Sequence, residues 1–172
     1  MSRQDLLHRV MKPARYLGGE AGSVVKDPDQ VRLSLALVFP ETYEIGMSHL
    51  GLKVLYEALA PRPEVAAERA FMPWVDLLDL MASQGEPPWA LESGRALGAF
   101  DVVGFSLGYE LTYTNALLLL KLAGIPPRRD ERGPEHPLVI AGGSAMVNPE
   151  PMADFLDLVV VGEAEELIHE LV

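Results

Sequence analysis

The 172-residue chain contains no cysteine. Within this chain, the absence excludes a disulfide framework, a thiolate zinc site, a cysteine nucleophile and a cysteine-held iron–sulfur cluster. Basic residues are also scarce, since 14 Lys and Arg stand against 25 Asp and Glu, for a formal net charge of −11. A nucleic-acid binder needs a basic face for the phosphate backbone, so we expect no nucleic-acid partner.

Long apolar runs are missing as well. The longest, residues 116–120, is far shorter than the roughly 20 residues that span a bilayer, and the first residues hold no apolar run long enough for a signal peptide. We therefore expect no membrane contact and a cytoplasmic location. The hydrophobic content of 49% is nevertheless too high for a disordered chain. The length fits one domain of about 150 residues with an added arm.

Charge is distributed unevenly along the chain. Residues 1–32 hold six Lys and Arg and four Asp and Glu, a net of +2, which leaves −13 for residues 33–172. The acidic body is explained either by solvated helix faces or by a basic partner that docks on it. Residues 1–30 are rich in Gly and Pro, with one or two helical turns at 5–11, and are predicted to form an N-terminal arm.

Five predicted strands alternate with helical patterns in residues 31–172. The near-continuous apolar run at 31–39 is typical of a strand buried on both faces, and the other strands are predicted at 67–72, 100–106, 138–141 and 158–161. Helices are predicted at 48–59, 73–84, 109–122, 149–155 and 163–172, and a short extended piece at 89–91. Ser48 is expected to cap the first of these helices, Gly85 to end the second, and the third to be largely buried.

This alternation predicts an α/β fold. We expect a flavodoxin-like or Rossmann-like, doubly wound, mostly parallel five-stranded sheet with helices on both faces, preceded by the arm. The last predicted helix stays amphipathic to residue 172 and has no C-terminal cap, so we expect the chain to be a fragment of a longer protein.

Ligands of open parallel sheets bind at the carboxyl ends of the strands. The loop after the first strand lacks a dinucleotide fingerprint. It also departs from a phosphate-binding loop, because Lys does not follow Gly51 and no Ser or Thr follows Lys53. Glu41 and Glu44 would repel a phosphate. A stand-alone flavin or nucleotide binder is therefore disfavoured.

Six segments occur in order along the chain: PARYLGGE (13–20), FPETYEIGMSHLGL (39–52), FMPW (71–74), DVVGFSLGYELTYTN (101–115), VIAGGSAMVNPEPMADF (139–155) and VVGEAEE (160–166). Together they resemble the N-terminal cobalamin-binding-like domain of radical S-adenosylmethionine (radical SAM) proteins. The resemblance implies a radical SAM enzyme as parent, whose own C-terminal barrel would be the partner of this domain. The iron–sulfur cluster and S-adenosylmethionine would belong to that barrel, and the present chain alone would have no turnover.

The resemblance also implies a cobalamin site. Cobalamin domains with a protein axial ligand carry D-x-H-x-x-G, S-x-L and G-G motifs. Here Met47 replaces the Asp, and Gly51 follows His49 by two places where the motif has three. The second motif is also altered, because Ser106-Leu107-Gly108 departs from S-x-L by one place. The third motif matches at Gly142-Gly143. His ligation is thus disfavoured, and a role for His49 as a helix cap or rim contact is the alternative. The residues implied in cofactor binding are Ser48, His49, Gly51, Ser106, Leu107, Gly142, Gly143 and Gly162.

A second interpretation remains open. The domain would bind no cofactor and would serve as a docking module, with the bulky Tyr43, Met47 and Tyr109 side chains filling the vacated pocket. Arg15, Tyr16 and Glu20 are expected to anchor the arm, either on the domain itself or on the barrel. No catalytic residue and no metal site are predicted in this chain.

Overall fold

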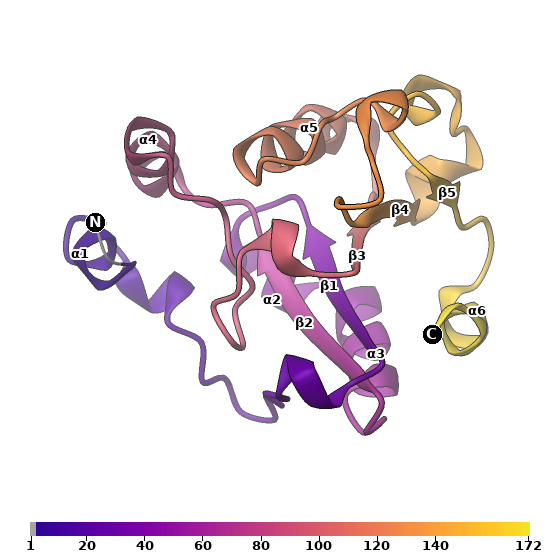
Figure 1. Cartoon of the computed structure of the whole chain (residues 1–172), viewed down its shortest axis with the longest axis horizontal. Helices are drawn as coiled ribbons and strands as arrows, with labels where there is room; N and C mark the ends of the chain where they lie inside the picture. The colour runs from indigo at the N-terminus through magenta and orange to yellow at the C-terminus, as the bar shows by residue number, and fades with distance from the viewer. Residues whose placement is uncertain (1–2) are drawn as a thin grey trace.

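A computed structural model describes residues 3–172 as a five-stranded sheet flanked by helices (Figure 1). The strands are β1 (Leu33–Phe39), β2 (Val65–Phe71), β3 (Val102–Ser106), β4 (Leu138–Gly142) and β5 (Leu158–Val159), in the spatial order β2-β1-β3-β4-β5. All of these pairings are parallel. This is the strand order of flavodoxin-like folds, and the predicted α/β class is confirmed.

The two halves of the sheet differ in length. β1 and β2 pair in register over seven residues, from Leu33 opposite Val65 to Phe39 opposite Phe71. At the opposite edge, β4 and β5 pair through only Ile140 with Leu158 and Ala141 with Val159. The sheet is therefore firmly built on the β2 side and thin on the β5 side.

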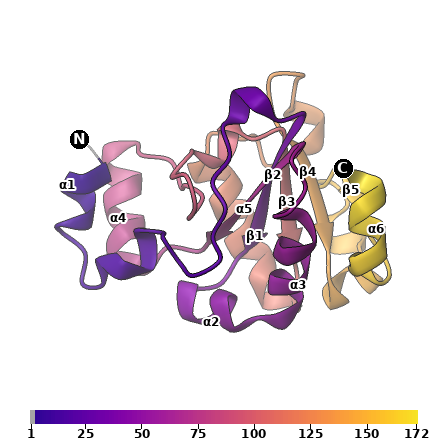
Figure 2. The ribbon, with the colours of Figure 1, turned by 90° about the horizontal axis from the view of Figure 1, so that it is seen from below.

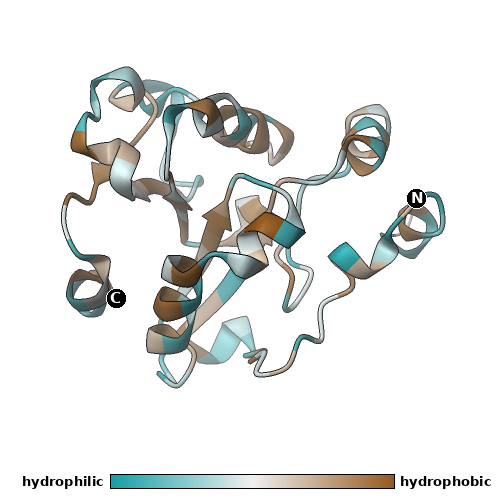
Figure 3. Cartoon of the chain, turned by 180° about the vertical axis from the view of Figure 1, so that it is seen from behind, coloured by the Kyte–Doolittle hydropathy of each residue, from teal (hydrophilic) through white to brown (hydrophobic). Residues whose placement is uncertain are grey.

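Helices cover both faces of the sheet, as predicted (Figure 2). On one face, α5 (Tyr113–Leu122) contributes Ala116, Leu119 and Leu120 to the core. On the other, α3 (Leu50–Leu59) packs on Leu35 and Leu37, and α6 (Ala164–Leu171) lies beside α3. Figure 3 shows hydrophobic residues in the central strands and in α3 and α5, the helices on the two faces. The near-continuous apolar sequence of β1 follows from this double covering.

The burial of α5 is less complete than expected. Leu118 is 38% exposed, because α5 packs on the sheet with one side and faces solvent with the other. The helix also begins later than predicted, since residues 110–112 form a single 3-10 turn.

The N-terminal arm is an integral part of the fold. Its helix α1 (Arg3–Leu7) pairs with α4 (Val75–Gln84) beyond the β2 edge (Figures 1 and 2). Leu6, Leu7, Val10, Tyr16, Leu77 and Met81 form a separate small core there. α4 ends at Gly85, whose φ of 69° is the left-handed cap that the sequence predicts.

The prediction was wrong at the start of α3. The segment before it, predicted as a loop, forms α2 (Tyr43–Ser48). Ser48 donates its hydroxyl to the Ile45 carbonyl at 2.8 Å, and so does not cap α3. Nδ1 of His49 takes that role, because it accepts the backbone N–H of Leu52 at 3.2 Å.

Short 3-10 turns fill several connections, at Pro13–Tyr16, Pro28–Gln30, Leu97–Ala99, Arg129–Glu131, Ser144–Val147 and Glu150–Met152. The last of these is all that forms of the helix expected at 149–155. The extended piece at 89–91 reduces to an isolated bridge between Trp89 and Ala96. Within residues 3–172, none of the helices has the length and apolar character that crossing a membrane would require.

Candidate functional site

A cavity of about 160 Å³ lies between the carboxyl half of the sheet and helices α3 and α6, and we call it the α3–α6 cavity. Its aliphatic walls are Leu35, Leu37, Leu55, Ile140, Val160, Ile168 and Leu171. The space exists because two positions on this face of the sheet are glycines. Gly104 pairs with Ile140, and Gly142 pairs with Ser106. A Cβ on Gly104 would stand 3.5 Å from Leu35 and Ile140, at ordinary contact distance.

Five of the eight residues implied by the resemblance line this cavity: His49, Gly51, Ser106, Gly142 and Gly143. The other three do not. Ser48 is exposed at the end of α2, and Leu107 is fully buried in the core under α5. Gly162 lies in the connection between the lining residues Val160 and Ala164.

Ser106 and His49 are the polar side chains among the residues that line the cavity. The Ser106 hydroxyl makes no hydrogen bond to the described part of the chain. Because Nδ1 of His49 accepts the Leu52 N–H, a neutral His49 ring carries its proton on Nε2. Both groups can therefore offer a donor to a ligand in otherwise apolar surroundings.

The His49 ring is held in place by two contacts. It caps α3, and its centroid lies 4.5 Å from that of Phe39. Gly51 leaves room for the ring, since a Cβ there would stand 3.1 Å from Cε1 of His49. A protonated Nε2 has no lone pair for a metal, and freeing it would cost α3 its cap. His49 in this arrangement does not fit the role of an axial cobalt ligand.

Gly142 and Gly143 shape the turn at the end of β4. The Leu107 N–H donates to the Gly142 carbonyl at 2.8 Å, and the Ala145 N–H donates to the Leu107 carbonyl at 3.1 Å. Gly143 has a φ of 110°, and a Cβ there would stand 2.5 Å from the Leu107 carbonyl oxygen. Only glycine tolerates this close approach. Leu107 thus binds the β3 and β4 ends together and does not face the cavity.

Exposed apolar side chains lie at the carboxyl ends of the strands, and we call them the apolar rim. After each of the five strands, the connection or the first turn of the next helix contributes at least one exposed apolar side chain, and these include Leu50, Trp74, Leu111, Val147 and Val161. Leu111 is 82% exposed and Val147 78% exposed. Exposed apolar residues gathered at one edge indicate a surface that contacts a ligand or another domain.

The side chains expected to plug a vacant pocket lie elsewhere. The Tyr43 hydroxyl donates to Glu20 at 3.0 Å, and the Tyr109 hydroxyl donates to Glu41. Met47 lies against Arg69, with its sulfur 3.6 Å from Nη1. None of the three lines the α3–α6 cavity.

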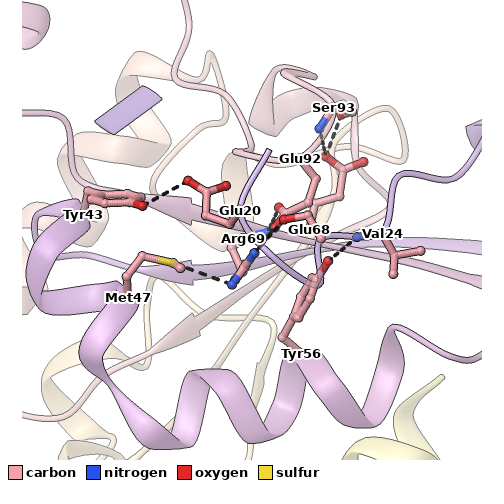
Figure 4. A network of polar contacts seen from close by, with 10 residues as sticks. Glu20, Val24, Tyr43, Met47, Tyr56, Glu68, Arg69, Glu92 and Ser93 are labelled. Atoms are coloured by element: carbon pink, nitrogen blue, oxygen red, sulfur yellow. Dashed lines mark hydrogen bonds and ion pairs between the residues drawn. The ribbon is translucent and has the colours of Figure 1, made fainter. Parts of the chain in front are cut away.

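A buried polar cluster lies over β2, and it was not predicted from the sequence (Figure 4). Arg69, 5% exposed, donates its backbone N–H and its guanidinium to Glu92 at 2.6 and 2.7 Å, and its guanidinium lies over the Tyr56 ring. Burial raises the pKa of the Glu92 carboxyl, and the hydrogen bonds and charge of Arg69 offset this only in part. The signal that could have found the cluster is the Glu68-Arg69 pair inside an otherwise apolar strand.

The arm is anchored on the domain by the residues predicted for it. Arg15 donates to Glu44 at 2.8 Å, and the Tyr16 hydroxyl accepts the backbone N–H of Trp74 at 3.0 Å. The Tyr43 hydroxyl reaches Glu20 in the same segment. Of the two alternatives, the structure shows the contacts with the domain itself.

Residues 51–172, well over half of the chain, match the family described as radical SAM proteins, N-terminal. The match begins within α3 and covers β2 to β5, α4, α5 and α6, including the glycines at the end of β4. No curated protein matches the chain. An N-terminal domain of this kind implies a parent protein with further domains. The chain belongs to the family of radical SAM protein N-terminal domains.

Proposed function

We propose that this domain is the corrinoid-binding accessory domain of a radical SAM enzyme. It would hold the nucleotide tail of cobalamin in the α3–α6 cavity and present the corrin ring beside the radical SAM region of the parent protein. The observation that carries the proposal is the Ser106 hydroxyl, which has no partner in the described chain and lines an apolar cavity at the carboxyl end of the sheet.

Size limits what the cavity would take. At about 160 Å³ it is well below the roughly 300–1,000 Å³ of pockets that enclose whole ligands. It suits a bicyclic heteroaromatic base, with Leu35, Leu37 and Ile168 against the ring faces and the Ser106 hydroxyl as hydrogen-bond partner. The larger corrin ring would rest outside, on the apolar rim, and His49 would not ligate cobalt.

In this proposal, α3, α6 and the apolar rim would each have a role in binding. A bound corrinoid supplies methyl-transfer chemistry, while the protein binds and orients it. The α3 and α6 side chains would exclude water from the base, and the rim would face the parent's radical SAM region. That region would hold the iron–sulfur cluster and S-adenosylmethionine.

The test is retention of corrinoid. The purified chain is mixed with hydroxocobalamin, free ligand is removed, and the visible spectrum of the protein fraction is recorded. Cobinamide, which lacks the nucleotide tail, is the matched ligand control. We expect cobalamin to be retained and cobinamide to be lost, because the tail is the part that the cavity would bind.

A cavity-filling variant sharpens the test. Gly104→Val adds a side chain suited to a strand at the floor of the cavity, where a Cβ meets only ordinary contacts. Gly108→Ala is the control, since a Cβ there meets nothing within 4 Å. Gly104→Val should lose cobalamin and keep its circular dichroism spectrum, and Gly108→Ala should keep both. Equal retention by the two variants would contradict tail binding in this cavity.

A docking module without cofactor is the second candidate, and two observations favour it. The rim is apolar and exposed, and the His49 ring is already used as the cap of α3. If the folded chain retains neither cobalamin nor cobinamide, this second function replaces the first.

A further inference from the structure

A second hollow lies on the opposite flank of α3 from the α3–α6 cavity, and we call it the α3–β2 hollow. It measures about 390 Å³ and lies between α3, the end of α2, β2 and residues 20–22 of the arm. Gly51 and Leu55 of α3 line the first cavity, whereas Lys53, Tyr56 and Glu57 line the hollow. The two spaces thus share a helix and no lining residue.

One side of the α3–β2 hollow offers positive charge. The Arg69 guanidinium is fixed by Glu92 at 2.7 Å, by the Ser23 hydroxyl at 3.1 Å and by the Tyr56 ring. Its Nη1 faces the sulfur of Met47, which is a weak acceptor, at 3.6 Å. The ammonium of Lys53 makes no hydrogen bond or ion pair with the described residues. A carboxylate in the hollow would therefore find two available donors.

The other side offers negative charge. Oε1 of Glu20 accepts the Tyr43 hydroxyl at 3.0 Å, whereas its Oε2 is shielded from solvent and has no partner in the described chain. A buried carboxylate oxygen without a donor is costly, so a ligand donor would relieve it. Glu57, one turn after Lys53, adds a second carboxylate to the lining. An ammonium group would find its partners here.

From this arrangement we infer that the α3–β2 hollow binds a small zwitterion of the α-amino-acid class. A simple anion would meet Glu20 and Glu57, and a simple cation would meet Arg69 and Lys53. A molecule that carries both charges satisfies the Arg69 and Lys53 donors with its carboxylate and Glu20 with its ammonium. The Tyr56 ring and the Met47 thioether leave room for an apolar side chain.

The test compares one amino acid with its two singly charged analogues. The 20 proteinogenic amino acids and L-norleucine are screened at millimolar concentration by thermal shift, and binders are measured by titration calorimetry. For norleucine the analogues are its amide, which lacks the carboxylate, and hexanoate, which lacks the ammonium; other binders are compared with their own amide and deaminated acid. We expect at least one amino acid to bind, and both of its analogues to bind at least about tenfold more weakly.

Variants locate the binding. Arg69 is avoided because its loss threatens the fold; Glu20→Gln keeps the Tyr43 contact, and Lys53→Gln lies on an exposed position. Each should weaken amino-acid binding at least about tenfold without lowering the unfolding temperature, whereas Lys121→Gln on α5 should bind as the original chain does. Binding that is equal in all three variants, or no binding by any amino acid, would overturn the inference. Cobalamin retention by the same variants should not change, so the two proposals can fail separately.

Discussion

The two flanks of α3 differ in polarity. Toward β3 and β4, Leu55 faces a cavity with aliphatic walls and glycines in its floor. Toward β2, Tyr56 covers Arg69, whose guanidinium is paired with a fully buried Glu92. The polar flank is fixed by its own hydrogen bonds beside the α3–β2 hollow, whereas the described residues that line the cavity of the apolar flank include no Lys, Arg, Asp or Glu. The fixed β2 side holds α3 in position above the α3–α6 cavity.

The largest expected effect comes from breaking the polar flank. Arg69→Ala leaves the Glu92 carboxylate buried without its partner, and should lower the free energy of unfolding by about 3–5 kcal/mol. Urea denaturation measures it. Arg128→Ala, which removes an exposed pair with Asp130, is the control and should cost at most about 1 kcal/mol. Similar losses in the two variants would mean that the buried pair does not stabilise the β2 side.

The difference in polarity also decides which features could be predicted from the sequence. The strands and the sheet class were predictable because β1, β3 and β4 are apolar over most of their length, which is a local pattern. The Arg69–Glu92 pair was not, since the partners are 23 residues apart and meet only in the fold. The glycine pair at 142–143 was predictable as a tight turn after a strand, but its contact with Leu107 was not.

Around His49, the sequence prediction was wrong about a helix and its cap. α2 was missed because it has only six residues and contains Gly46, a poor helix former, in residues 43–48. The cap of α3 was assigned to Ser48 because hydroxyl residues usually hold that position. In the structure Ser48 still belongs to α2, so its neighbour His49 becomes the first residue free to cap α3.

On the apolar flank, the Gly142–Gly143 turn should give the next largest effect. Gly143→Ala adds backbone strain of about 1–3 kcal/mol and a Cβ that overlaps the Leu107 carbonyl oxygen. Gly85→Ala is the matched control, because Gly85 also has a positive φ but a Cβ there meets nothing within 4 Å. The free energy of unfolding should fall more in Gly143→Ala than in Gly85→Ala. Equal losses would show that the contact with Leu107 is not tight.

The cap of α3 should give a smaller effect. His49→Ala removes the acceptor for the Leu52 N–H and should cost about 1 kcal/mol, whereas His49→Asn supplies another capping oxygen and should cost only a few tenths. Thermal unfolding compares the two. Cobalamin retention by His49→Asn should match that of the original chain, because Ser106 is the assigned hydrogen-bond partner of the tail, and a loss of retention would give His49 a direct part in binding.

The smallest effect concerns acid, and it separates the buried carboxylate of the polar flank from an exposed one. Burial raises the pKa of Glu92 above its ordinary value of 4.5, so the folded chain takes up this proton at higher pH than the unfolded chain. The stability of the original chain relative to Glu92→Gln should therefore increase as the pH falls through the raised pKa toward 4.5. Glu64 is the opposite case, since hydrogen bonds from its own backbone N–H and from Arg62 lower its pKa. Relative to Glu64→Gln, the original chain should lose stability as the pH falls below 4.5. Urea denaturation at a series of pH values measures both differences, and the same sign for the two variants would mean that Arg69 outweighs the burial of Glu92.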